Sequence, residues 1–169
     1  MIKRNVKTLI LAAGCAALLC GCTKSNIVQP DPTEGPDFNL YNDIVISEEQ
    51  LHYDVDDIYL DPDDYPMAAA IDFELHLDEA YVDVTVVVKD GTTPEDTAFF
   101  TDVAIKGIND QVAVQAFSIG ESAEDTFGGL YQDNEINLKV YTESEYEAQG
   151  EPIYETKIPM DTYMTFDIK

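Results

Sequence analysis

Three residue types are absent or nearly absent from most of this 169-residue chain, and each absence excludes or disfavours a class of reaction or ligand. There is no tryptophan, the only arginine is Arg4, and all three cysteines (Cys15, Cys20 and Cys22) lie in the first 22 residues. Beyond residue 22 the chain therefore has neither a disulfide nor a cysteine nucleophile. The missing tryptophan also disfavours recognition of sugars by aromatic stacking.

Positive charge is scarce throughout the rest of the chain. After residue 22 there are six lysines against all 34 acidic residues, a net charge of −28, and the three basic residues before that point bring the whole chain to −25. Nucleic-acid binding needs a basic surface, and bidentate recognition of phosphate relies on arginine. Nucleic-acid binding is therefore excluded and bidentate phosphate recognition is disfavoured, whereas the partner class that this charge favours is a cationic protein or peptide.

The amino terminus has the layout of a secretory signal. Lys3, Arg4 and Lys7 precede an apolar or small-residue run at 9–22, and a polar stretch follows. Fourteen helical residues extend only about 21 Å, less than the roughly 30 Å of a hydrocarbon core. We therefore expect residues 1–21 to be a signal peptide rather than a membrane span.

The end of that run, Leu19-Cys20-Gly21-Cys22, resembles the lipobox of bacterial lipoproteins. The resemblance implies diacylglycerol on the Cys22 sulfur, cleavage between Gly21 and Cys22, and usually a further acyl chain on the new amine. It further implies a lipid-anchored, extracytoplasmic protein of the cell envelope, in the outer membrane if the cell has one, because Thr23 rather than aspartate follows the cysteine. The alternatives are a poorer lipobox ending at Cys15 and an ordinary secretory signal cut elsewhere.

Two further regions follow the signal. Residues 22–36 are expected to be the lipidated cysteine and a flexible tether, because they carry three prolines and a glycine among few apolar residues. Residues 37–169 are expected to form one acidic β domain, which is long enough to bury a core.

Several segments of this domain alternate apolar and polar residues with the period of two that a half-buried strand requires. They are 71–77, 82–88, 102–107, 111–120, 136–142 and 163–169. Six short strands predict a mainly β fold, a single antiparallel β-sandwich (Ig-like) or a barrel. One or two short helical turns are expected, at 93–99 and 122–127. Residues 48–60 are left open between helix and strand, although Ser47-Glu48-Glu49-Gln50 has the form of a capping box.

The densest acidic cluster is a candidate calcium site. Calcium takes six to eight oxygen ligands, which closely spaced aspartates in a loop supply. The spacing does not match an EF-hand loop, and a solvated acidic loop is the favoured interpretation. The cluster comprises Asp54, Asp56, Asp57, Asp61, Asp63 and Asp64.

A second candidate group surrounds His76 on the outward face of one predicted strand, together with Asp72, Glu74 and Asp78. Neighbours on one face of a strand are about 7 Å apart, so at most two of them could share an ion without help from another strand. A solvated face is the favoured interpretation here as well. His52 has no identifiable partner and is interpreted as structural or exposed.

No enzyme motif stands out. None of the serines lies in a G-x-S-x-G context, and with 34 acidic residues any pair of carboxylates could be nominated for hydrolysis. The sequence therefore predicts a non-catalytic, lipid-anchored envelope or surface protein with a binding or structural role and no cofactor. The alternatives are a calcium-dependent adhesion module and, less favoured, an envelope hydrolase that uses acidic residues.

Overall fold

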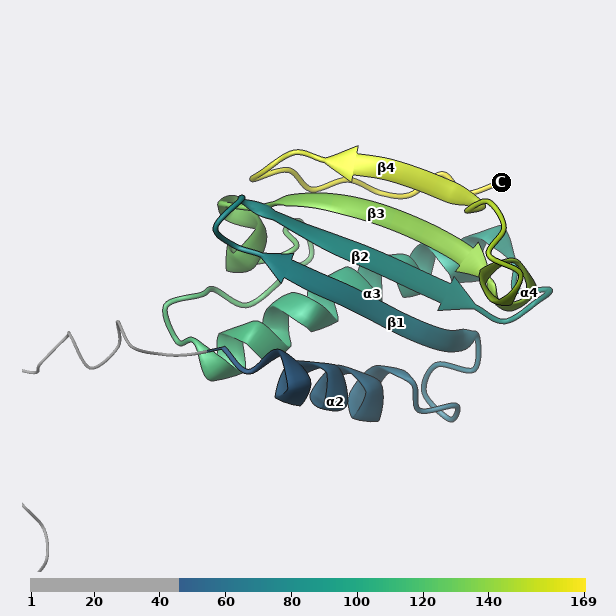
Figure 1. The fold of residues 1–169 in the computed structure, drawn as a ribbon, viewed down its shortest axis with the longest axis horizontal. Helices are drawn as coiled ribbons and strands as arrows, with labels where there is room; N and C mark the ends of the chain where they lie inside the picture. The colour runs from purple at the N-terminus through teal and green to yellow at the C-terminus, as the bar shows by residue number, and fades with distance from the viewer. Residues whose placement is uncertain (1–45) are drawn as a thin grey trace, which may run out of the picture. The chain divides into compact units, whose positions relative to one another are not determined.

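The computed structural model describes residues 46–169, so the predicted signal peptide, Cys22 and the tether lie outside the described residues. Four strands form a single open sheet in the order β1-β2-β3-β4 (Figure 1). β1–β2 and β3–β4 are antiparallel pairs, whereas the central β2–β3 pair is parallel. The strands are β1 (Ala68–His76), β2 (Tyr81–Val88), β3 (Glu135–Thr142) and β4 (Tyr154–Ile158).

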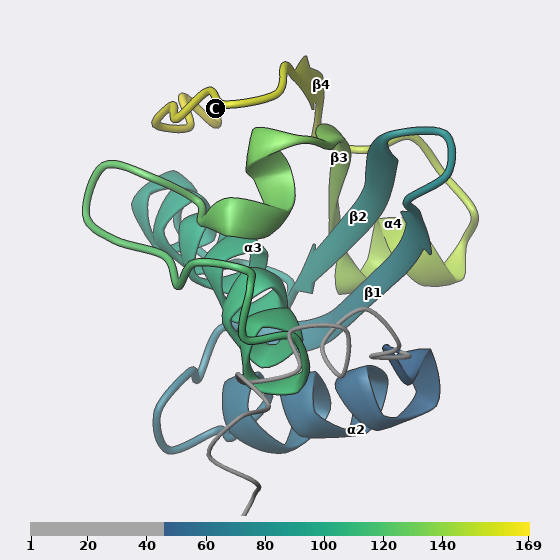
Figure 2. The same ribbon diagram turned by 90° about the vertical axis from the view of Figure 1, so that its left-hand side faces the viewer.

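Helices connect and cover these strands. Because neighbouring parallel strands need a crossover, the long helix α3 (Pro94–Gln115) links β2 to β3. α2 (Glu48–Tyr59) packs against α3 and β1. The short helix α4 (Glu143–Glu147) lies on the opposite side of the sheet from α3 (Figure 2), and the 3₁₀ helix η2 (Gly129–Gln132) precedes β3.

The segment left open between helix and strand is the helix α2. The Ser47 side chain accepts a hydrogen bond from the Gln50 backbone N–H at 3.4 Å, as an N-cap residue does. Leu51 and Val55, one turn apart, are fully buried. The structure thus agrees with the helical alternative for this segment.

The predicted antiparallel sandwich or barrel is wrong. Among residues 46–169 there is one open mixed sheet with helices, an α/β arrangement. The main cause is α3, which contains the predicted strand 102–107 and the first half of the predicted strand 111–120. The helical turn expected at 93–99 is the start of this same helix, where Thr93 accepts from the Asp96 N–H at 3.1 Å and Pro94 occupies the first turn.

The pattern of burial shows why α3 is a helix. Its fully buried residues recur every three or four positions, whereas Val114, which a strand would have placed beside Val112, is 64% exposed. Short windows of this segment show alternation, but the whole 22 residues follow the helical period. The fully buried apolar residues of α3 are Phe100, Ala104, Ile105, Ile108 and Val112.

The core lies between α3 and one face of the sheet. Where α2 packs against α3, Gly107 leaves room for the Tyr59 ring of α2, which a Cβ at that position would strike. The predicted inward sets of β2 and β3 are confirmed, since all of their members are buried. These are Val82, Val84, Val86 and Val88, and Ile136, Leu138 and Val140.

Two other predicted elements differ from the structure. Residues 163–169 form no strand, although Phe166 and Ile168 are buried and join the core. Residues 122–127 form no helical turn and instead contain an isolated bridge between Ala123 and Thr126. Within the described residues, no helix is both long and apolar enough to span a bilayer.

Candidate binding site on the open face of the sheet

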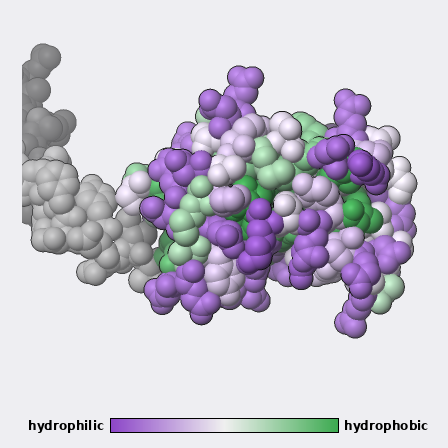
Figure 3. Space-filling model, turned by 90° about the horizontal axis from the view of Figure 1, so that it is seen from above, coloured by the Kyte–Doolittle hydropathy of each residue, from purple (hydrophilic) through white to green (hydrophobic). Residues whose placement is uncertain are grey.

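The face of the sheet opposite α3, called the open face below, carries polar side chains from all four strands. Side chains alternate between the two faces of a strand, so the burial of the valines on β2 turns their neighbours outward. Hydrophilic residues also dominate the surface seen from the β4 side (Figure 3). The polar members of the open face are Asp72, Glu74, His76, Tyr81, Asp83, Thr85, Glu135, Asn137, Lys139, Glu155 and Lys157.

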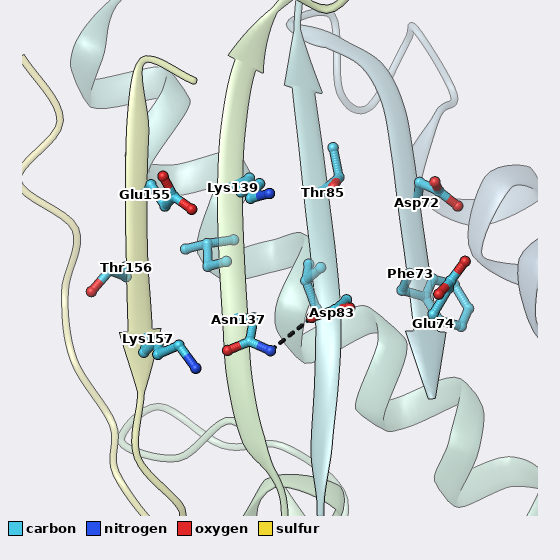
Figure 4. Close-up of a pocket in the computed structure, with 12 residues that line it drawn as sticks. Asp72, Phe73, Glu74, Asp83, Thr85, Asn137, Lys139, Glu155, Thr156 and Lys157 are labelled. Carbon is cyan, nitrogen blue, oxygen red and sulfur yellow. Dashed lines mark hydrogen bonds between the residues drawn. The ribbon is translucent and has the colours of Figure 1, made fainter. Parts of the chain in front are cut away.

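The centre of this face is an open depression of about 410 Å³ lined by residues of all four strands (Figure 4). Strand register arranges its polar residues in two rows across the sheet. One row is Glu74–Asp83–Asn137–Lys157, and the other is Asp72–Thr85–Lys139–Glu155.

Charge is distributed unevenly over the depression. Both lysines come from β3 and β4, and Lys157 pairs with Glu135 at 3.2 Å. The β1 and β2 side carries Asp72, Glu74 and Asp83, called the acidic half below, and none of the three pairs with a lysine within residues 46–169.

Three side chains of the open face converge where β1 meets β2. The Nε2 atom of His76 lies 3.3 Å from Glu74 Oε2 and 3.5 Å from Asp83 Oδ2. Within residues 46–169, this is the one group of three histidine, cysteine or carboxylate side chains whose ligand atoms all lie within 4.8 Å of one another. The sequence placed Glu74 beside His76, and strand pairing adds Asp83.

Aromatic residues flank the depression. At one end, Tyr141 packs edge-on against Tyr146 of α4, and Ser144 donates to Asp90 through its backbone N–H and its hydroxyl. At the other end, Tyr81 stacks on His76 with ring centroids 4.3 Å apart. Desolvation raises the pKa of Tyr81, and the negative charges of its acidic neighbours, Glu79 first, raise it further.

The six aspartates of the predicted calcium site are spread over a helix and the turn that follows it. Asp54, Asp56 and Asp57 belong to α2, where Asp54 accepts from the Gln50 side chain at 2.7 Å. Asp61 caps the turn by accepting from the Asp63 N–H at 2.9 Å. No three of the six bring their carboxylate oxygens together as the His76 group does. Calcium binding here stays a prediction.

One member of that cluster has a perturbed carboxyl group. Desolvation raises the pKa of Asp56, His52 partly offsets the rise, and the charge of Asp72 adds to it. His52 itself stacks on Phe73 with ring centroids 4.1 Å apart, in keeping with the structural role expected of it.

The sequence signal for the open face was only partial. The alternation in 71–77 and 82–88 placed Asp72, Glu74 and Asp83 outward. It did not say which strands are neighbours, so Asp83, Asn137 and Lys157 could not be assembled into one row. β4, which contributes Glu155 and Lys157, is only five residues long, and although its burial alternates, only Tyr154 and Ile158 of its inward positions are apolar.

Comparisons with known proteins do not place the chain in a family. No protein-family model, no curated protein and no solved structure matches it. The geometry and charge of the open face are therefore the observations from which a function is inferred.

Proposed function

We propose that this chain is a non-catalytic, lipid-anchored protein of the bacterial cell envelope that binds a cationic protein or peptide. The observation that carries the proposal is the acidic half of the open face. Its three carboxylates lie on two neighbouring strands beside an open depression, and none pairs with a lysine of the described residues. Lysine or arginine side chains of a partner would supply the missing counter-charges.

The charge of the whole domain supports the same partner class. Four of the 34 acidic residues precede residue 46, which leaves 30 against five lysines in the described part. Only Lys106 and Lys157 form lysine–carboxylate ion pairs there. Such an excess creates a negative potential around the domain, and this potential accelerates encounter with cationic partners and repels anionic ones.

The proposed anchor explains how such a domain stays at a membrane surface. Anionic headgroups would repel it, so the acyl chains on Cys22 provide the attachment, at about 0.8 kcal/mol per buried methylene. The tether of residues 22–36 then holds the open face away from the bilayer, where a partner can reach it.

Affinity capture from envelope extracts tests the binding role. The chain should capture a basic partner at low salt and release it at high salt, because screening weakens the attraction. The variant Asp72→Asn, Glu74→Gln, Asp83→Asn should lose most of the captured partner.

The matched control removes the same charge from α2 through Glu48→Gln, Glu49→Gln and Asp57→Asn. This control should retain the partner. Equal loss of the partner in both variants would show that net charge attracts the partner without a defined site. Capture that does not change with salt concentration would contradict an electrostatic interface.

Metabolic labelling with a fatty acid tests the anchor separately. The native chain should be labelled and processed, whereas Cys22→Ser should remain as an unlabelled precursor. A labelled serine variant would refute acylation at Cys22, and normal cleavage of that variant to a released form would indicate an ordinary secretory signal.

A further inference from the structure

We propose that Glu74, His76 and Asp83 form a binding site for one zinc ion. The inference goes beyond the proposed function and does not rest on the lipid anchor, although Glu74 and Asp83 also belong to the acidic half proposed to meet a cationic partner. It rests on the arrangement of three side chains from two strands of the open face, a nitrogen and two carboxylate oxygens, which are ligand types that zinc accepts.

Strand geometry brings the three ligands together. Glu74 and His76 lie two residues apart on β1, so they share a face of that strand. Asp83 of β2 is the register partner of Glu74 and lies diagonally across from His76, whose own partner is Tyr81. The cross-strand neighbour thus supplies the third ligand that a single strand cannot provide.

The distances between the ligand atoms suit a tetrahedral ion. In a zinc site with metal–ligand bonds of about 2.0–2.1 Å, two ligand atoms lie about 3.3–3.4 Å apart. The Nε2 atom of His76 lies 3.3 Å from Glu74 Oε2 and 3.5 Å from Asp83 Oδ2. All three atoms lie within 4.8 Å of one another, so small side-chain rotations would close the set around one ion.

The same distances do not fit a strong ion pair. A charge-assisted N–H···O bond spans about 2.7–2.9 Å, shorter than either separation here. Although the His76 side chain is 30% exposed, its Nε2 atom is shielded from solvent and has no hydrogen-bond partner. A nitrogen that points between two carboxylates without a bond of its own has the arrangement of a metal ligand.

Neighbouring residues orient two of the ligands. Asn137 donates from Nδ2 to Asp83 Oδ1 at 2.7 Å (Figure 4). The other oxygen, Oδ2, is the one that lies 3.5 Å from the imidazole Nε2. Tyr81 stacks on the His76 ring and restricts its rotation. Contacts of this kind behind the ligands are typical of protein metal sites.

The donor set selects among metals. Calcium and magnesium prefer oxygen ligands alone and in larger number, whereas an imidazole with two carboxylates suits zinc. The two carboxylates balance the charge of Zn²⁺. The nearest lysine in the row, Lys157, pairs with Glu135 and leaves that balance intact. The Glu74 and Asp83 side chains are 72% and 48% exposed, so a solvent molecule can complete the tetrahedron.

The test uses the two histidines of the chain as internal probes. The full chain, with Cys15, Cys20 and Cys22 replaced by serine to remove competing thiols, is purified in detergent and titrated with zinc chloride. Long-range ¹⁵N–¹H NMR spectra resolve the two imidazoles. Zinc should shift the Nε2 resonance of His76 at one equivalent and leave His52 unchanged, and the same concentration of calcium should shift neither.

Variants measured by calorimetry complete the test. His76→Ala should weaken zinc binding by more than the roughly 10- to 100-fold that loss of an outer-shell partner costs. His52→Ala and Asp72→Asn, a neutralisation on the same face, should bind as the parent does. Equal shifts of both histidines, no saturation at one equivalent, or equal affinity in His76→Ala and His52→Ala would overturn the proposal and leave a diffuse acidic surface. Capture of a cationic partner is measured separately, without zinc, and its variants include Asp72, so a failure of the zinc site is distinguishable from a failure of the partner interface.

Discussion

The two faces of the four-stranded sheet differ in almost every physical respect although they are built from alternate residues of the same strands. The covered face consists mainly of apolar side chains such as Leu138 and Phe73, which are buried in the core. The open face has charged neighbours such as Lys139 and Glu155 in the same register, exposed beside an open depression. One residue along the chain separates the two environments.

The covered face provides the stability of the domain, whereas the open face is available for binding. Burial of aliphatic area supplies most of the free energy of folding, so the covered face tolerates little change. The open face contributes few buried groups and can carry ligands, charges and partners at little cost to the fold. A conspicuous exception is Val87, which points to the open face yet is only 2% exposed, at the end where α4 contacts β2 and β3.

The largest predicted effect tests this separation with adjacent residues of β3. Leu138→Ala should lower the free energy of unfolding by about 2–5 kcal/mol, because the side chain is fully buried and leaves a cavity. Lys139→Ala, one residue along, should change it by at most about 0.5 kcal/mol. Urea denaturation measures both, and equal effects would break the distinction between the faces.

A pair of asparagines sharpens the comparison for polar groups. Asn109 of α3 is fully buried and accepts a hydrogen bond from the Leu130 N–H at 2.9 Å. Asn109→Ala should lower the free energy of unfolding by about 1–3 kcal/mol, because the Leu130 N–H loses its partner, and loss of packing should lower it further. Asn137→Ala on the open face should cost only about 0.5–1.5 kcal/mol, since water can replace its bond to Asp83. A reversed order in thermal denaturation would contradict this account.

Salt provides a third, smaller effect that involves the exposed charges rather than the core. Most carboxylates of residues 46–169 have no lysine partner, so mutual repulsion should lower stability at neutral pH. Raising sodium chloride from 0.01 to 0.15 M shortens the Debye length from about 30 to about 8 Å. The Tm of the domain 37–169 should rise by several degrees. A flat or falling Tm would mean that the negative charges are compensated internally.

The smallest predicted effect concerns Asp56, whose pKa is raised by desolvation and by the charge of Asp72. A raised carboxyl pKa means that the fold disfavours the ionised form, so Asp56→Asn should be stabilising at pH 7. Because this carboxyl is exposed and solvent screens its interactions, the gain should be at most about 0.5 kcal/mol. The gain should vanish as the pH falls below the ordinary value of 3.8. Glu48→Gln, which removes equal charge from the first turn of α2, should instead destabilise. Thermal melts at pH 7 and pH 3 distinguish the two.

Strands with strict alternation were predictable from the sequence. Val82, Val84 and Val86 on β2, and Ile136 and Leu138 on β3, occupy the buried face that their period of two indicates. The capping box at Ser47 likewise marked the start of α2. In each case the pattern that predicts the element lies within a few residues, so local sequence is sufficient evidence.

Failures occurred where the evidence is distant in sequence. The alternation of Val112 and Val114 indicated a strand, but Val112 packs into the core as part of a 22-residue helix while Val114 stays exposed. β4 has few apolar residues, and its pairing with β3 is what makes it a strand. The candidate site shows the same limit, because Asp83 meets His76 only through the β1–β2 register.

By itself the sequence determined the strong negative charge, the lack of cysteine and arginine beyond residue 22, and the inward faces of β2 and β3, because composition and short-range periodicity require no partner. Only the tertiary structure decided that β2 and β3 are parallel neighbours joined through α3, and that Glu74, His76 and Asp83 converge. Strand order and register depend on how α3 packs its apolar residues over the sheet. That packing joins residues far apart in the chain, and no local pattern specifies it.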